Sequence, residues 1–441
     1  MGKTVPPPVP TFREALAFWL RLGFIGFGGP AGQIAIMHEY LVDRKRWISN
    51  SRFMHALNYC MLLPGPEAQQ LAVYTGWMLH GTRGGLAAGV LFVLPSAFIL
   101  LALSVLYVQY GQLPAVQSVL DFLKPAVLAL VALALVKIAG KSLQTFLHYL
   151  VAVAAFVAIY FGRVPFPFII VGAILTGIAF QAAYKSQSNP ENGQTPASAD
   201  PESSFLINAN TTLAESGFSM QRLFRQLAVA GLLWSLPLGL IYVLSQHFEF
   251  WKKLCLFFTQ AALVTFGGAY AVLPYVAQVS VEKLGWLTSS QMVDGLALGE
   301  TTPGPLIIVL AFVGFMAGYH QFGGSLAAAT AGLWATVFYT FLPSFLFIFA
   351  GAPIIERTRA NPAVRSVLNF ATAAVAGVIL SLLLYLGQAV LAPHPPQVQW
   401  NPLAWTLLSL AALRFFKINL MVWIGVSAAA GLLKYAILPN L

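Results

Sequence analysis

Long apolar runs recur along the whole sequence and constrain its fold more than any other feature. Charged residues make up only 9% of the 441 residues, whereas a soluble domain carries about 25%. A membrane helix needs roughly 20 mainly apolar residues, and several of the runs reach or approach that length. The runs are Gly85–Val108, Ala126–Leu135, Leu227–Leu244, Leu306–Ala317, Leu326–Ala352 and Val375–Leu391. The sequence therefore predicts an all-α polytopic membrane protein.

The charged and sulfur-containing residues exclude several other classes. A net charge of +10 does not indicate nucleic-acid binding here, because Lys and Arg of a membrane protein gather in its cytoplasmic loops. Cys60 and Cys255 give neither a metal-ligand spacing nor a disulfide framework, so we expect both to be small buried apolar residues. The N-terminus has prolines and no short apolar core with a cleavage site, so no removable signal peptide is predicted. We expect no metal and no cofactor.

The sequence contains two copies of one unit. Phe27–Gly29 recurs as Phe266–Gly268, and Pro64–Pro66 recurs as Pro303–Pro305, both at an offset of 239 residues. Further pairs at this offset are Asp43-Arg44 with Glu282-Lys283, Trp47 with Trp286, and Gly84-Gly85 with Gly323-Gly324. The match resumes at an offset of 248, where Leu94-Pro95-Ser96 pairs with Leu342-Pro343-Ser344 and the run 116–122 pairs with 364–370. One register held across so many special residues indicates a duplication.

These offsets divide the chain into four parts. Residues 1–13 form an N-terminal tail, 14–185 the first repeat, 186–252 a polar linker followed by a connecting transmembrane helix, and 253–437 the second repeat. The stretch Ser186–Ser219 is rich in Ser, Pro and Gly. We expect it to be a solvated linker with little regular structure.

The distribution of Lys and Arg favours two repeats of inverted topology. Two arrangements were compared, one in which every hydrophobic segment spans and one in which the segments with FGG and PGP are re-entrant hairpins. The hairpins would be 14–41, 53–80, 256–279 and 291–319. The hairpin arrangement gathers more Lys and Arg on one side, and both arrangements invert the repeats. Inverted repeats with discontinuous helices are a recurring transporter architecture.

The FGG and PGP motifs predict broken helices with anion-binding ends. Pro removes a backbone donor and clashes with the preceding turn, while Gly permits unusual dihedral angles. Each new helix would expose free N–H groups and a partial positive charge. The alternative is that Gly and Pro only kink the helices or permit close packing. The predicted substrate-binding residues are Gly28, Gly29, Pro30, Gln33, Pro64, Gly65, Pro66, Gln69, Gly267, Gly268, Thr301, Thr302, Pro303, Gly304 and Pro305.

Four ionisable residues in apolar segments are functional candidates, because burying a charge in a membrane is costly. Glu67 follows the first PGP and Glu300 precedes the second, so both are predicted to couple protons to transport. Glu67 could instead cap the N–H groups of the new helix. Arg21 and Lys124 are predicted to neutralise an anion, although Arg21 could snorkel to the interface and Lys124 could pair locally with Asp121.

The two halves are similar to the chromate ion transporter family. The resemblance rests on FGGPAGQIAIMHEYLV and LLPGPEAQQLAVYTGWMLHGTRGGLAAG in the first half, and on FGGAYAVLPYV followed by ETTPGPLIIVLAFVGF in the second. It covers nearly the whole chain and implies multi-pass insertion in a bacterial inner membrane, with chromate efflux energised by the proton gradient. The halves differ at Ala269, where the first has Pro30, and at Leu306, where the first has Glu67. The predicted half-sites are therefore not equivalent.

The predicted function is export of chromate by alternating access, as a secondary active antiporter rather than an enzyme. The alternative within transport is sulfate or a general oxyanion. A membrane enzyme would need a convergent His, Cys or carboxylate cluster, and a scaffold would not need paired helix breaks. No glycine-rich phosphate loop is present, so we expect an ion gradient to drive transport. The expected partners are the oxyanion, protons and the lipid bilayer, with no nucleic acid, and a homodimer is compatible with this interpretation.

Overall fold

The structure is a computed structural model that describes residues 7–184, 202–208, 211, 219–266, 268–355, 362–393 and 397–437. The first half forms α1 (Phe12–Ile25), α2 (Gly29–His38), α3 (Asn50–Cys60), α4 (Glu67–Tyr110), α5 (Pro114–Ser142), α6 (Phe146–Tyr160) and α7 (Phe166–Tyr184). The second half forms α9 (Phe248–Leu263), α10 (Ala269–Ala277), α11 (Ser289–Glu300), α12 (Val309–Gln321), α13 (Leu326–Ile355), α14 (Pro362–Leu391), α15 (Trp400–Arg414) and α16 (Leu420–Ile437). The helix α8 (Met220–Leu244) connects the halves. The prediction of an all-α membrane protein is confirmed for the described residues.

Among the described residues, six helices are long and apolar enough to cross a membrane: α4, α5, α8, α13, α14 and α16. Shorter apolar helices lie at Phe146–Tyr160, Phe166–Gln181 and Leu306–Gln321. Every apolar run of the sequence falls within one of these elements. Apolar residues such as Phe98, Leu232 and Val426 stay exposed, which suits a surface that faces lipid.

The elements repeat at the offsets seen in the sequence. A π-helical turn follows α2 at Glu39–Arg44, and another follows α10 at Gln278–Lys283, 239 residues later. The long helix α4 is kinked at His80 and Gly81, where the backbone leaves the helical conformation. The corresponding place in the second half, Gln321 to Leu326, separates α12 from α13. A kink in one half is thus a full break in the other.

The predicted breaks at FGG and PGP are present in both halves. Gly28, in the left-handed conformation, caps α2 and Pro30 lies in its first turn, as the missing N–H of proline favours. Pro66 caps α4, so Glu67 becomes its first residue. In the second half Gly268 caps α10 and Pro305 caps a 3-10 turn, Leu306–Ile308, that leads into α12.

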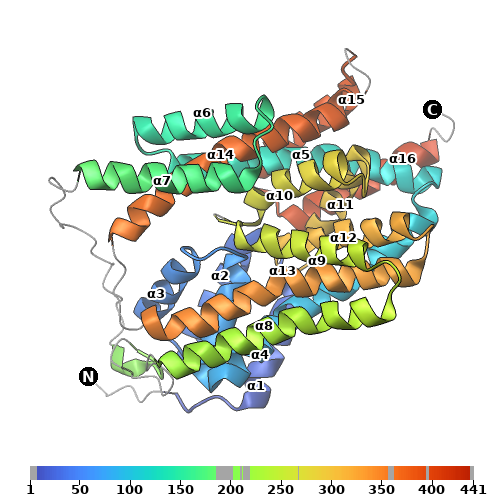
Figure 1. Cartoon of the computed structure of the whole chain (residues 1–441). Helices are drawn as coiled ribbons and strands as arrows, with labels where there is room; N and C mark the ends of the chain where they lie inside the picture. The colour runs from blue at the N-terminus through green and yellow to red at the C-terminus, as the bar shows by residue number, and fades with distance from the viewer. Residues whose placement is uncertain are drawn as a thin grey trace.

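The last two helices of each half pack against the other half. The helices α6 and α7 pack on α14, whereas α15 and α16 pack on α5, and Figure 1 shows α6 and α7 alongside α14. Equivalent glycines make both contacts close. A Cβ on Gly177 would lie 3.0 Å from Val367 Cα, and a Cβ on Gly431 would lie 2.7 Å from Val119 Cα.

Part of the linker differs from the expectation of a solvated segment. Glu202–Ser204 forms a 3-10 turn, and Ile207 makes a parallel bridge with Ile48. Phe205 and Ile207 are buried against the first half. These two apolar side chains in a polar stretch explain the docking, because burying them removes apolar surface from water. Of the rest of Ser186–Ser219, only Leu206, Asn208, Thr211 and Ser219 are described.

Candidate anion site at the crossing of the broken helices

The PGP break of each half is hydrogen-bonded to the FGG break of the other. The N–H of Gly65 donates to the carbonyl of Thr265 at 2.7 Å, and the N–H of Gly304 donates to the carbonyl of Gly26 at 2.9 Å. The two bonds are related by the same 239-residue offset. They join the four helix breaks in two pairs, each with one break from either half, and we call this region the crossing. They also occupy the N–H groups of Gly65 and Gly304, so an anion at this crossing would be held by other donors.

A serine from the opposite half covers each of these glycines. A Cβ on Gly65 would lie 2.7 Å from Ser344 Oγ, and a Cβ on Gly304 would lie 2.7 Å from Ser96 Oγ. Both glycines have positive φ, +122° and +97°, a region that L-residues rarely adopt. Only glycine satisfies both the dihedral angle and the space. The serines come from the duplicated Leu-Pro-Ser motif, which the sequence analysis used for the repeat and not for the site.

Three buried glutamines surround the crossing. Gln33 donates its amide to the carbonyls of Gly26 and Gly304, at 2.9 Å for Gly26, and thereby joins a break of each half. Gln70 donates to the Pro64 carbonyl at 2.7 Å. The side chain of Gln69 is fully buried, and neither of its amide atoms has a protein partner among the described residues.

Several buried polar atoms around the crossing have no protein partner among the described residues. They are Gln33 Oε1, Gln70 Oε1, both amide atoms of Gln69, and Ser344 Oγ. A buried polar atom without a partner costs about 1–3 kcal/mol, so native structures rarely keep several together. The second half has Val272, Ile308 and Val309 at the positions of the three glutamines. The three glutamines are therefore contributed by the first half alone.

The remaining glycines of the FGG motifs face open space. A Cβ on Gly28, Gly29 or Gly268 would meet nothing within 4 Å. All three have positive φ, a backbone conformation that residues with a Cβ atom rarely adopt. Gly267 lies outside the described residues. The predicted prolines Pro30, Pro64, Pro303 and Pro305 lie at the breaks and shape them.

The two predicted coupling carboxylates occupy different surroundings. Glu67 is partly buried at the start of α4, and Lys141 and Lys137 of α5 interact with it electrostatically. Glu300 is 7% exposed at the end of α11 and accepts a 2.6 Å hydrogen bond from the hydroxyl of Tyr270. Glu67 thus lies near cations, whereas Glu300 lies beside a neutral donor.

The hydroxyls of Thr301 and Thr302 are engaged locally. Both donate to the carbonyl of Leu298, at 2.7 and 2.8 Å. This pattern satisfies an open carbonyl at the end of α11. The hydroxyl oxygens keep acceptor capacity but have already used their one proton each. They are therefore poorly suited to donate to an anion.

Arg21 and Lys124, the two cations predicted to neutralise an anion, lie in other surroundings. Arg21 is exposed on α1. Lys124 Nζ lies 3.0 Å from Asp294 Oδ1, and the hydroxyl of Tyr107 donates to Asp294 Oδ2 at 2.9 Å. Asp121, the local partner considered from sequence, lies 3.9 Å from Lys434 instead. The positive charge of Lys124 is thus compensated by a carboxylate of the other half.

Asp294 was missed by the sequence analysis. It is 3% exposed in the middle of α11. The available signal was its position inside a predicted membrane segment, where an ionisable residue is a functional candidate by default. Its three-way contact joins α4 and α5 of the first half to α11 of the second.

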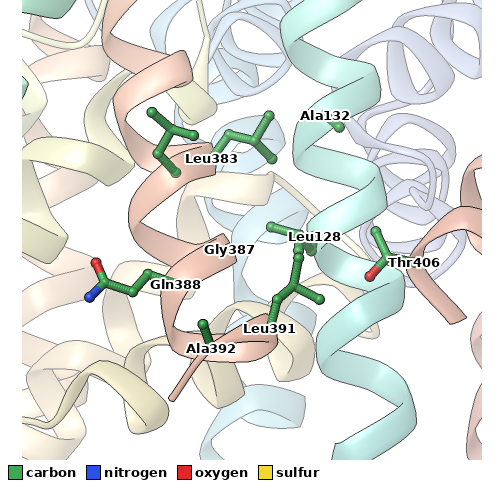
Figure 2. A pocket seen from close by; sticks show the side chains of 9 residues that line it. Leu128, Ala132, Leu383, Gly387, Gln388, Leu391, Ala392 and Thr406 are labelled. Carbon is green, nitrogen blue, oxygen red and sulfur yellow. The ribbon is translucent and has the colours of Figure 1, made fainter. Parts of the chain in front are cut away.

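The cavity drawn in Figure 2 does not contain any of the predicted site residues. It measures about 610 Å³ and lies between α5, α14 and the start of α15, with Leu128, Leu383, Leu391 and Thr406 in its wall. In Figure 2 the side chain of Gln388 projects from α14 on the side away from Thr406. The wall is almost entirely apolar, so this cavity is unsuited to a dianion, whose burial requires hydrogen bonds or charges.

Comparison with known proteins places the chain in a family. The sequence profile described as "Chromate transporter" matches twice, at residues 13–178 and 252–432. The "Chromate transport protein" of Pseudomonas aeruginosa is 32% identical, with 99% of this chain and 95% of that protein covered. The "Chromate transport protein" of Cupriavidus metallidurans is 29% identical, with 100% and 97% covered. No solved structure matches the chain. The chain belongs to the chromate transporter family.

Proposed function

We propose that the protein exports chromate across a bacterial inner membrane, and that the anion binds where the four helix breaks meet. Family membership supports chromate as the substrate, since relatives that span nearly the whole chain carry the name of chromate transport proteins. The presence of two buried donors without a described protein partner, Gln69 Nε2 and Ser344 Oγ, supports the location. It is the single observation that carries the proposal.

The donors of the proposed site are amide groups rather than full positive charges. The Nε2 of Gln69 is free to donate, and the first N–H groups of α4 have no partner within the helix. The partial positive charge of the helix start adds to them. Such a set recognises a small oxyanion by its oxygens. Because sulfate resembles chromate in charge and shape, sulfate is the alternative substrate.

Alternating access at this site would use the bonds between the halves. Gly65 with Thr265, Gly304 with Gly26, and Gln33 with Gly304 all cross from one half to the other. Rocking of one half against the other would therefore change the geometry of the crossing. In inverted-repeat transporters such motion occurs around a fixed central site. We propose Glu67 as the coupling carboxylate, because it lies beside both the proposed site and Lys141.

The experiment is chromate flux into proteoliposomes with an imposed pH gradient, with excess sulfate as competitor. We expect uptake that follows the gradient and resists sulfate. Equal competition by sulfate would make the protein a general oxyanion carrier. Absence of flux in every gradient would contradict the transport proposal.

A further inference from the structure

A long apolar groove runs between α4, α8 and α13. It has a volume of about 490 Å³, and its wall includes Val90 and Val93 from α4, Ala230 and Leu233 from α8, and Phe341 and Phe345 from α13. From Thr82 to Ala97 it follows α4 for about 22 Å at 1.5 Å per residue. That length exceeds half of the roughly 30 Å hydrocarbon core of a bilayer.

The helix α8 buries little of its surface against the other described helices. Only 6% of its apolar window is buried, compared with 44% for α4 and 50% for α13. Hydrogen bonds to α9 and α13 tie it to its neighbours, among them one from the hydroxyl of Tyr339 on α13 to the Trp234 carbonyl at 2.8 Å. Trp234 Nε1 donates to Thr259 Oγ1 of α9 at 2.9 Å, and Gln226 Nε2 donates to the Phe349 carbonyl of α13 at 3.0 Å. The face of α8 toward α4 is left without protein cover.

The polar residues of the groove gather at one end. Arg225 and Gln226 of α8 lie beside Phe349, and a Cβ on Gly85 would be 2.8 Å from the ring of Phe349. Thr82 therefore lies at this end as well, three residues before Gly85. The far end is apolar, where Trp334 packs edge-on against Phe98. The groove is thus apolar along most of its length, with the exposed guanidinium of Arg225 at one end.

We propose that an anionic phospholipid occupies this groove, with an acyl chain along α4 and its phosphate at Arg225. The apolar wall matches a hydrocarbon chain, and a chromate-sized dianion would find no donors along it. Guanidinium and phosphate form charge-assisted hydrogen bonds. Since α4 and α13 come from different halves, the bound lipid would contact both.

Native mass spectrometry of the full-length protein tests this proposal. The probe is an equal mixture of phosphatidylglycerol and phosphatidylcholine with the same acyl chains. We expect the protein to retain phosphatidylglycerol about fivefold more than phosphatidylcholine, the effect of one basic residue near a lipid surface. Arg225→Ala should abolish this preference, and Arg225→Lys should keep most of it. Ala230→Trp, which fills the groove, should reduce retention of both lipids.

The control is Lys252→Ala, which removes an exposed basic residue from α9 outside the groove. It should behave as the wild type. Equal retention of the two lipids by the wild type would overturn the proposal, as would the same preference in Arg225→Ala and Lys252→Ala. The measurement needs no transport, so its outcome is independent of the proposed chromate export.

Discussion

The Cα atom of Gly65 lies against the hydroxyl of Ser344, close enough that an added methyl group would be 2.7 Å from Ser344 Oγ. The same methyl group would be 2.8 Å from the amide nitrogen of Gln70. Gly65 belongs to the first half and Ser344 to the second, 279 positions apart in the sequence. The contact therefore reports directly on how the halves meet.

Substituting Gly65 by alanine should damage both stability and transport. The new side chain must adopt φ near +122°, which costs roughly 1–2 kcal/mol, and it overpacks the crossing by roughly 1–3 kcal/mol. We expect a lower thermal unfolding midpoint and chromate flux reduced at least about tenfold. Gly140→Ala is the matched control, because its Cβ would meet nothing within 4 Å on α5. Wild-type flux in Gly65→Ala would refute the proposed site.

Substitutions of Gln69 and Gln70 should affect chromate affinity and protein stability differently. Gln69→Leu removes two unpartnered buried atoms, so we expect the unfolding midpoint to stay level or rise. Its chromate affinity should fall about tenfold or more, since a hydrogen bond to a charged ligand is lost. Gln70→Leu loses the bond to the Pro64 carbonyl and should be less stable by about 1 kcal/mol. Chromate titration and thermal unfolding of both variants are the measurements. Unchanged affinity in Gln69→Leu would exclude it as a ligand.

Glu67→Gln should uncouple transport from the proton gradient. The variant keeps the size and hydrogen-bonding capacity of the side chain but cannot release a proton. We therefore expect chromate exchange without a gradient to persist while gradient-driven accumulation disappears. Glu300→Gln is the comparison, because a glutamine oxygen can still accept the bond from Tyr270. If accumulation survives in Glu67→Gln and is lost in Glu300→Gln, the coupling role belongs to Glu300.

The pair formed by Lys124 and Asp294 should matter most when only one partner is removed. Asp294→Asn leaves the partly buried ammonium of Lys124, 21% exposed, without its carboxylate. Breaking a fully buried pair costs 3–5 kcal/mol, and the partial exposure here lowers the expectation to about 1–3 kcal/mol. The double variant Lys124→Met/Asp294→Asn should recover most of this loss in thermal unfolding. Lys252→Ala, in an exposed pair with Glu249, should change stability by no more than about 1 kcal/mol.

Local sequence chemistry was sufficient to predict the helix breaks. Gly28, Pro30, Gly65 and Gly304 act through their own backbone geometry, and such effects are readable from residue type and neighbours. The duplication was readable for the same reason, since its markers are Gly, Pro and Trp at fixed offsets. The kink at His80 and Gly81 was not predicted, because glycines occur at many other places in membrane helices without breaking them.

Contacts between distant segments could not be predicted. Lys124 was predicted to neutralise an anion, with a local pair to Asp121 as the alternative, whereas its observed partner is 170 positions distant. Ser344 was noted only as part of a repeated tripeptide. In both cases the partner is fixed by how α5, α11 and α13 pack, and a hydrophobic pattern shared by all membrane helices does not specify that packing.

The exchange of α6 and α7 for α15 and α16 makes the chain an intramolecular counterpart of a domain-swapped dimer. After a protease cut between the halves, we expect the two fragments to stay associated. Fusion also frees the two copies to diverge. In a dimer of identical halves, any glutamine at the crossing would appear twice. Here Gln33, Gln69 and Gln70 correspond to Val272, Ile308 and Val309 in the other copy, so one copy is free to specialise in recognition and the other in support.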